Sequence, residues 1–346
     1  PAQGGDAGWK KAIADYKKDG GKVLLYFNGK LIDRESEFYK SGPGKEICYR
    51  DNTGAELFEQ YKFTGQGTFL GDYNARTFVV ADTRAPIWRK MLLDWADRAR
   101  EYGANSVFYD QLGYGERATN WDLSREFPVP NMHVIADKAE VLKMVRDRNV
   151  SFDPEFALGT EWLTDVTAQY CDYIHIYQTT AGKYSFIDWF RYTFPEIIIS
   201  DREIRDDTDI ERRVNNTLLK GLRNDIEIYR CRDLIDKTPH YQAYLAKANA
   251  IKARYEDLLL VGTYRDTEGF TQSNPGIEAR AYTNGDGMAV VATRTQPGAA
   301  VKGAIEVPGY RFAEASTLGG AQVSPDGREV TLGQYDLAVL VYKKTK

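Results

Sequence analysis

The 346-residue chain has few of the residues that hold metal ions or disulfide frameworks. It contains three cysteines, Cys48, Cys171 and Cys231, and three histidines, none of them paired at the short spacings of zinc ligands. The odd number of widely separated cysteines also argues against a disulfide framework. Metal-dependent hydrolases and disulfide-rich domains are therefore disfavoured, and we expect neither a cofactor nor a metal.

Long apolar runs and an excess of one charge are lacking as well. No stretch approaches the roughly 20 apolar residues of a membrane span. The 46 basic and 50 acidic residues leave a net charge of −4, which offers little to a phosphate backbone, so nucleic acid is not an expected partner. The chain starts at Pro1 without a methionine. A removed signal peptide or an upstream region is left open, with a secreted, periplasmic or cell-surface location as the expectation.

Aromatic residues, in contrast, are plentiful, with 23 Tyr, 15 Phe and 6 Trp. Flat rings that also carry a hydroxyl or an indole N–H suit an uncharged, polyhydroxylated ligand. The length allows a large barrel domain with a smaller partner domain. A carbohydrate is therefore the expected partner.

The segment from residue 87 to residue 115 shows the repeating unit of the chain. Apolar residues at three- and four-residue spacing predict a helix over 87–102, which Gly103 ends. The apolar run 107–109 then predicts a buried strand that stops at Asp110. In parallel α/β folds the carboxyl ends of the strands carry the working face, so Asp110 is expected to point into a site. The structural alternative is that Asp110 only caps the following turn.

Similar helix-turn-strand units recur along the chain. They predict strands at 23–27, 156–159, 173–177 and 197–199. Residues 34–76 and 113–132 are expected to form long loops, with a hairpin as the alternative for 34–76. Five or six such units fall short of the eight of a closed barrel. We therefore expect an α/β, TIM-type (β/α) barrel over 1–270 whose first strands lie upstream of Pro1, with an upstream segment or chain completing the barrel.

After about Thr271 the apolar period changes to two. The runs 278–283 and 288–294 flank Asn284-Gly285-Asp286-Gly287, a strong hairpin signal. Residues 271–346 are accordingly expected to form an antiparallel β-sandwich of roughly six to eight strands.

A second carboxylate, Glu161, stands at the end of the strand predicted at 156–159 and is followed by Trp162. Two acids at the ends of different strands of one barrel are what glycoside hydrolysis needs, one as proton donor and one as nucleophile or base. Trp162 could supply an apolar wall that favours a neutral acid at Glu161. The alternative is that Glu161 starts the next helix, where acids are favoured.

The motifs that carry these residues resemble a known family. V-L-L-Y-F-N-G, F-Y-D-Q-L-G, G-T-E-W and F-R-Y-T-F-P-E, followed by a β-sandwich, are similar to the retaining α-glycosidase barrels of the α-galactosidase-like and endo-α-N-acetylgalactosaminidase-like kind. The resemblance covers most of the chain from about Gly8. It implies that Asp110 is the nucleophile and Glu161 the acid/base, with hydrolysis of an α-glycosidic bond and retained configuration.

Other polar or aromatic residues at strand ends are candidates for binding sugar hydroxyls. They are Asn28, Asp33, Tyr109, Gln111, Trp162, His175, Tyr177 and Arg191. His175 could instead be a core histidine inside an apolar strand. Arg191 could instead form an ion pair with Glu196 or Asp188.

Two rival functions remain at this point. A non-catalytic carbohydrate-binding barrel would have lost turnover, which the presence of both Asp110 and Glu161 disfavours. A barrel enzyme of unrelated chemistry, such as an aldolase or a phosphate-handling isomerase, would need a strand-end lysine or a glycine-rich phosphate loop before a helix, and neither pattern is present.

Overall fold

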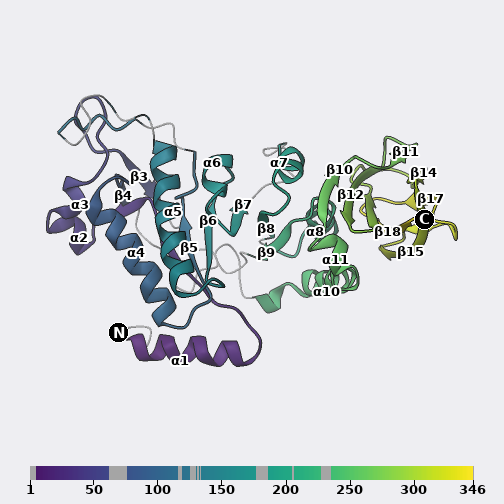
Figure 1. Ribbon diagram of the computed structural model, residues 1–346, viewed down its shortest axis with the longest axis horizontal. Helices are drawn as coiled ribbons and strands as arrows, with labels where there is room; N and C mark the ends of the chain where they lie inside the picture. Colours follow the sequence, from purple (N-terminus) through teal and green to yellow (C-terminus); the bar gives the residue numbers. More distant parts are fainter. Residues whose placement is uncertain are drawn as a thin grey trace. The chain divides into compact units, whose positions relative to one another are not determined.

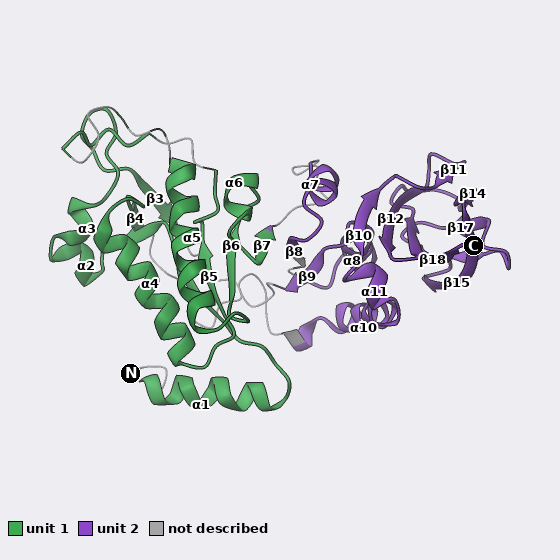
Figure 2. Ribbon diagram, in the orientation of Figure 1, with its two compact units in different colours: residues 1–65, 69–175 green, residues 66–68, 176–346 purple. Residues whose placement is uncertain are grey.

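The computed structural model describes residues 5–61, 76–115, 119–124, 130, 132, 134–176, 186–204, 206–226 and 235–345. The chain divides into two compact units (Figure 2). Unit 1 comprises residues 1–65 and 69–175, and unit 2 comprises residues 66–68 and 176–346. Each unit is described by itself.

Unit 1 is built on parallel strands in the order β1-β5-β6-β7 (Figure 1). The strands are β1 (Leu24–Asn28), β5 (Ser106–Asp110), β6 (Ala157–Glu161) and β7 (Tyr173–Ile176). Every residue of β5 except Asp110 is buried, as expected of a strand that is covered on both faces. Only the strand end is left partly open to solvent.

Helices α4 (Pro86–Glu101) and α5 (Val134–Phe152) pack against each other and against the strands of unit 1. The helix predicted over 87–102 is confirmed, but its fully buried stripe is Trp88, Leu92, Ala96 and Ala99, whereas Ile87 is exposed. Gly103 follows it with φ 87°, the left-handed conformation of a helix end. Two short or peripheral helices, α1 (Gly5–Lys18) and α6 (Asp165–Ala168), complete the set.

The segment expected to be a loop over 34–76 contributes to a small antiparallel sheet. Its order is β2-β4-β3, with β2 (Leu31–Asp33), β3 (Phe58–Tyr61) and β4 (Arg76–Val80). Two short helices, α2 (Glu37–Lys40) and α3 (Pro43–Glu46), lie between β2 and β3 in the chain. The sheet has a core of its own around Leu31, Tyr49 and Val80. It carries side chains toward the end of β5, as shown below.

Unit 2 contains one further pair of parallel strands, β8 (Ile198–Ile204) and β9 (Arg223–Ile226). Its helices are α7 (Ile187–Thr193), α8 (Ile210–Leu219), α10 (Pro239–Arg254) and α11 (Glu256–Leu259), with a 3₁₀ turn at η2 (Ile235–Lys237). The predicted helices at 185–192 and from 238 onward are confirmed to within a few residues.

The C-terminal part of unit 2 is β-rich. A five-stranded antiparallel sheet, β10-β12-β13-β18-β15, and a four-stranded one, β11-β14-β17-β16, share one hydrophobic core. The predicted hairpin is confirmed, since Asn284 pairs with Gly287 at its turn. The bounds are β10 (Thr263–Asp266), β11 (Thr271–Gln272), β12 (Glu278–Asn284), β13 (Gly287–Thr293), β14 (Val301–Glu306), β15 (Tyr310–Leu318), β16 (Gln322–Val323), β17 (Glu329–Leu332) and β18 (Leu337–Lys344).

Within unit 2, α8, α10 and α11 bury their apolar faces against the five-stranded sheet, in a cluster that joins Val214 and Tyr241 to Tyr282 and Val339. The first strand of that sheet, β10, begins at Thr263. The expected division into domains 1–270 and 271–346 stays a prediction.

The expected fold class is confirmed at the level of an α/β fold with a parallel central sheet and a β-rich C-terminal region. In the part of the chain that the structure describes, unit 1 has four parallel strands and unit 2 has two, in line with the five or six units expected. Closure into a barrel and the missing first strands stay predictions. No helix among the described residues is long and apolar enough to cross a membrane.

Candidate active site

Four polar residues form one row at the carboxyl ends of the parallel strands of unit 1. Asn28 of β1 pairs with Asp110 of β5, and Glu161 of β6 pairs with His175 of β7. Tyr109 pairs with Thr160, so the next residues along, Asp110 and Glu161, are neighbours across β5 and β6. Residues in one row of a sheet project from the same face. We call Asn28, Asp110, Glu161 and His175 the polar row.

The backbone is strained directly after both acids of the polar row. Gln111 follows Asp110 with φ 60°, and Trp162 follows Glu161 with φ 73°. A non-glycine residue in this left-handed region costs roughly 1–2 kcal/mol, and such strain gathers at functional sites. Both strands therefore turn sharply at the point where they present an acid.

A buried hydroxyl ties these two strand ends together. Thr160 is fully buried, and its Oγ1 donates to the carbonyl of Tyr109 at 2.8 Å and accepts from the amide of Gly113 at 2.8 Å. A side chain at Gly113 would place Cβ 2.4 Å from the carbonyl oxygen of Glu161. Gly113 is thus required for the turn after Asp110 to approach the backbone of Glu161 so closely.

The Asp110 carboxyl group is half-buried and its hydrogen bonds converge on one oxygen. Its Oδ2 accepts from the hydroxyl of Tyr26 and from Nδ2 of Asn28, the latter at 3.4 Å. Asn28 is itself oriented, because its Oδ1 accepts from the amides of Lys30 and Leu31 at 2.9 and 2.8 Å. No hydrogen bond between described residues uses Oδ1 of Asp110.

A network from the small antiparallel sheet surrounds Gln111. The side-chain nitrogen Nε2 of Gln111 donates to the Tyr61 hydroxyl at 2.7 Å and to the Glu59 carboxylate at 3.3 Å. Glu59 also accepts from Tyr61 at 2.5 Å and forms an ion pair with Lys30. Although burial by itself would raise it, the hydrogen bonds from Lys30 and Tyr61 hold the pKa of Glu59 below its ordinary value. Burial and the bond to Glu59 raise the pKa of Tyr61. We call Lys30, Glu59, Tyr61 and Gln111 the Glu59 network.

Aromatic rings lie beside this network. The rings of Tyr114 and Trp162 are 5.0 Å apart between centroids, and Nζ of Lys30 is 5.3 Å from the centre of the Tyr114 ring. Tyr114 is 39% exposed, so its ring is accessible from solvent. Lys138 stabilises the turn that follows Asp110, because its ammonium group donates to the carbonyl of Tyr114 at 3.0 Å. An exposed ring next to strand-end acids suits a sugar face.

Tyr109 corrects one sequence-based expectation. The sequence places Tyr109 among the candidates for binding sugar hydroxyls, but its side chain is fully buried and its hydroxyl donates to the carbonyl of Leu92 in α4. Successive side chains of a strand point to opposite faces, so Tyr109 and Asp110 cannot both face the site. The amide of Gly113, in the turn after Asp110, donates to Thr160.

Asp33 ends β2 and is held by contacts of a structural kind. It pairs with Arg76 at 3.1 Å and accepts from the amide of Glu35 at 2.8 Å. No contact between described residues links its side chain to Asp110, so its expected role at the substrate stays untested.

His175 and Arg191 have different surroundings. His175 is nearly buried, with its ring edge toward Phe108 at 5.7 Å, yet it also stands in the polar row. Arg191 belongs to unit 2, where it is buried and donates to the carbonyls of Pro195 and Ile197 at 2.9 and 2.7 Å.

The remaining expectations about these positions have simple outcomes. Asp188, one of the two acids considered as a partner of Arg191, pairs instead with Arg280 and Lys220 at 3.0 and 3.2 Å. Tyr177 lies outside the described residues. The described residues contain no group of three or more His, Cys, Asp or Glu side chains that could hold a metal.

Sequence reasoning missed several residues that surround Asp110. Tyr26 could have been found, because it stands two residues before Asn28 on the same face of an alternating strand. No sequence pattern indicates that Glu59 and Tyr61 lie near Asp110, because they reach Gln111 only through the pairing of β3 with β4.

The fold is one that glycoside hydrolases have. A maltogenic α-amylase, AmyB, from Thermotoga neapolitana matches with a TM-score of 0.61 at 11% identity over 98% of this chain and 81% of its own. Bacillus licheniformis trehalose-6-phosphate hydrolase matches with a TM-score of 0.63 at 10% identity over 98% and 86%. An Anoxybacillus α-amylase, assigned to a glycosyl hydrolase subclass, matches with a TM-score of 0.60 at 11% identity over 98% and 80%. Identities this low show the fold alone.

Sequence comparison gives the family. A Monosiga brevicollis protein named "Putative glycoside hydrolase 22789" is 26% identical over 123 residues, which are 35% of this chain and 10% of that protein. The chain thus spans about a tenth of the length of this relative. The family model described as "Domain of unknown function (DUF6259)" matches residues 1–200, more than half of the chain. The chain belongs to this family.

Proposed function

We propose that the chain is a glycoside hydrolase that cleaves an α-glycosidic bond with retention of configuration. The observation that carries the proposal is the placement of Asp110 and Glu161 in one row on adjacent strands. Neighbouring strands lie about 4.8 Å apart. Two carboxyl groups in such positions suit the roughly 5–5.5 Å separation of retaining enzymes better than the wider spacing of inverting ones.

Asp110 is the nucleophile in this proposal. Tyr26 and Asn28 both bond to Oδ2, which orients the group and leaves Oδ1 to attack the anomeric carbon. The bond to the leaving oxygen breaks as the bond to Oδ1 forms, which gives a covalent glycosyl-enzyme. Thr160 and Gly113 act as positioning residues, because they hold the two strand ends together.

Glu161 is the acid and base. It is 6% exposed, in a setting that excludes most water. Its proton passes to the departing oxygen in the first step, and in the second step the carboxylate removes a proton from the water that attacks the glycosyl-enzyme. The rings of Trp162 and Tyr114 lie beside it and would pack against the sugar.

The substrate class is an α-linked sugar of a glycan or polysaccharide. The motifs around Asp110 and Glu161 favour an α-galactoside or an α-N-acetylgalactosaminide, while the structural neighbours are named for α-amylase and trehalose-6-phosphate hydrolase activities. Asn28, Gln111, His175 and the Glu59 network would bind the hydroxyl groups that distinguish these sugars. Closure of a (β/α) barrel around the polar row is part of the same proposal.

A panel of aryl α-glycosides tests the proposal. The sugars are galactose, N-acetylgalactosamine, glucose and rhamnose, and the enzymes are wild type, Asp110→Asn and Glu155→Gln. Glu155 is a matched control because it is exposed and precedes β6, at the opposite end of the strand from Glu161. We expect release of the aryl alcohol by the wild type and by Glu155→Gln, and none by Asp110→Asn.

The alternative is a carbohydrate-binding protein without turnover, and the same panel separates it. Saturable binding of one of these glycosides without release of the aryl alcohol would favour the alternative. Equal turnover by wild type and Asp110→Asn would refute the assignment of Asp110.

A further inference from the structure

Unit 2 contains a groove with a volume of about 380 Å³ between β9, α10 and α11. Arg223 and Asn224 line it from β9, and Asn249 and Lys252 from α10. The proposed glycosidase reaction uses none of these residues. The groove therefore needs an explanation of its own.

Lys252 is a buried cation with neutral partners. Lys252 is 8% exposed. Its ammonium group donates to the carbonyl of Leu222 at 3.4 Å and to Oδ1 of Asn224 at 3.2 Å. Asn224 is oriented for this contact, because its Nδ2 donates to Thr217 at 2.8 Å. Burial and then the charge of Arg223 lower the pKa of Lys252 to about 8.

Arg223 is the second cation of the groove and is partly buried. Its polar partner within the described residues is the carbonyl of Leu260, at 3.4 Å. Burial, followed by the charge of Arg191, lowers the pKa of Arg223. A guanidinium has five N–H donors, so most of those on Arg223 are not used by that bond. The carboxylate of Glu256 also lines the groove, but it forms no ion pair with either cation in the described part of the chain.

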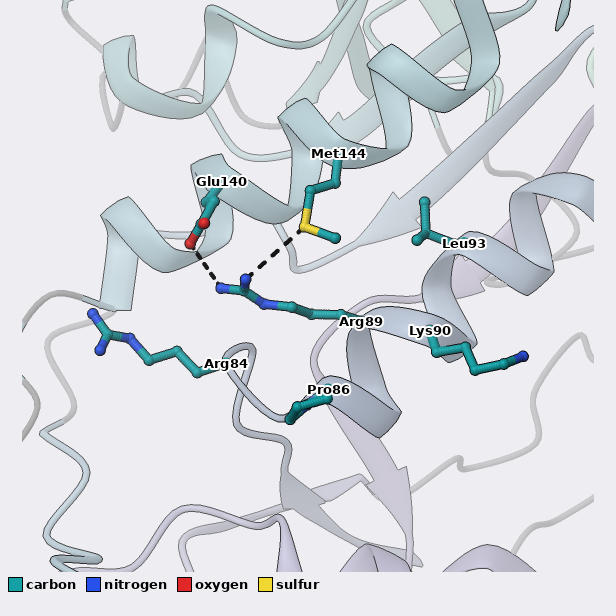
Figure 3. Close-up of a pocket in the computed structure, with 7 residues that line it drawn as sticks. All are labelled: Arg84, Pro86, Arg89, Lys90, Leu93, Glu140 and Met144. Carbon is teal, nitrogen blue, oxygen red and sulfur yellow. Dashed lines mark hydrogen bonds and ion pairs between the residues drawn. The ribbon is translucent and has the colours of Figure 1, made fainter. Parts of the chain in front are cut away.

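A groove in unit 1 shows the contrasting arrangement. It has a volume of about 590 Å³ and lies between α4 and α5, where Arg89 reaches Glu140 and Met144 (Figure 3). Each of its cations has an acid, in the pairs Arg84–Asp137 at 2.7 Å, Arg89–Glu140 at 2.8 Å and Lys90–Asp94 at 2.6 Å. The cations of that groove are thus paired with acids, whereas Arg223 and Lys252 form no ion pair with a described residue.

We propose that the groove between β9 and α10 binds a small oxyanion, a phosphate or sulfate group, through Arg223 and Lys252. Burying the Lys252 charge without a counter-charge is unfavourable, and the partly buried guanidinium of Arg223 repels it in addition. An oxyanion removes both penalties. The guanidinium fork matches two oxygens of such a group, and the ammonium supplies a point charge to a third. The amide of Asn249 can donate to the same ligand from the rim.

Calorimetric titration of the full chain tests this site. Sodium phosphate and sodium sulfate are compared with sodium chloride at matched ionic strength, for wild type, Lys252→Met and Lys247→Met. Lys247 is the matched control because it is an exposed lysine on the same helix. We expect saturable binding of phosphate or sulfate by the wild type and by Lys247→Met, and an affinity at least tenfold weaker in Lys252→Met. Arg223→Gln is a second variant with the same expected loss.

Three results would overturn the proposal. The first is an absence of any phosphate or sulfate binding by the wild type beyond that of chloride. The second is equal affinity in Lys252→Met, Lys247→Met and wild type. The third is binding of phosphate or sulfate by a Glu256→Gln variant but not by the wild type, because the Glu256 carboxylate would then be the counter-charge of the groove. The readout is binding in unit 2, so none of these results bears on the proposed glycosidase activity.

Discussion

Replacing Thr160 by valine removes the hydroxyl that joins the two strand ends while keeping the shape of the side chain. Thr160 makes two buried hydrogen bonds of 2.8 Å, one to the carbonyl of Tyr109 and one from the amide of Gly113. Valine leaves that buried amide without this partner, and a buried polar group that loses its partner costs about 1–3 kcal/mol. With the weaker loss at the carbonyl, we expect Thr160→Val to lower the free energy of unfolding by about 2–3 kcal/mol.

Denaturant unfolding followed by tryptophan fluorescence measures this loss, with two comparison variants. Thr160→Ser keeps the hydroxyl and loses one buried methyl group, for which we expect about 1 kcal/mol. Thr53→Val removes an exposed hydroxyl that donates to Asp51 at 2.7 Å, for which we expect within about 0.5 kcal/mol. The reasoning is refuted if Thr160→Ser is as unstable as Thr160→Val, or if Thr160→Val is no less stable than Thr53→Val.

Three further predictions concern other parts of the structure. Gly113→Ala should lower turnover strongly, because the new Cβ would lie 2.4 Å from the carbonyl oxygen of Glu161. Steady-state kinetics that separate kcat from KM measure this effect, and an unchanged kcat would contradict the prediction. Glu59→Gln should flatten the acid side of the stability curve. The folded-state pKa of Glu59 is lowered, so its contribution to the free energy of unfolding is complete above the unfolded-state pKa of about 4.3 and is lost as the pH falls through the folded-state pKa. Unfolding of wild type and Glu59→Gln measured from pH 6 to pH 3 tests this. Parallel stability curves for the two proteins would contradict it. Lys252 has a folded-state pKa of about 8, so the unfolded chain binds more protons than the folded chain between that pH and roughly 10.4, and stability should rise with pH in this window. Lys252→Met should lose that rise in unfolding curves, and phosphate should weaken it in the wild type.

The sequence predicts the parallel strands of unit 1 well, because their signals are local. The run before Asp110 is short, apolar and β-branched or aromatic, and a strongly periodic helix and Gly103 precede it. The same local logic places Glu161 at the end of β6 and Asn28 at the end of β1. A period of two and a tight turn likewise identify the hairpin at Asn284.

The sequence does not predict what depends on pairing between distant segments. Glu59 approaches Gln111 only because β3 joins a sheet with β2 and β4, and the polar stretch that contains it has no periodicity of its own. Tyr109 stands next to Asp110 in the sequence, but alternation along the strand directs its side chain to the opposite face, where it bonds to Leu92. The groove around Lys252 had no signal either, since a lysine on a helix is ordinarily exposed.

The most direct test of the proposed reaction is to trap the glycosyl-enzyme in Glu161→Gln. An activated aryl α-glycoside needs little proton donation to leave, so the first step should proceed, and the second should be slow without a base. Mass spectrometry of the digested protein should then show one sugar unit on the peptide that contains Asp110. Azide should restore turnover and give a glycosyl azide of α configuration. An unlabelled Asp110, a sugar on another residue, or a product of inverted configuration would contradict the account.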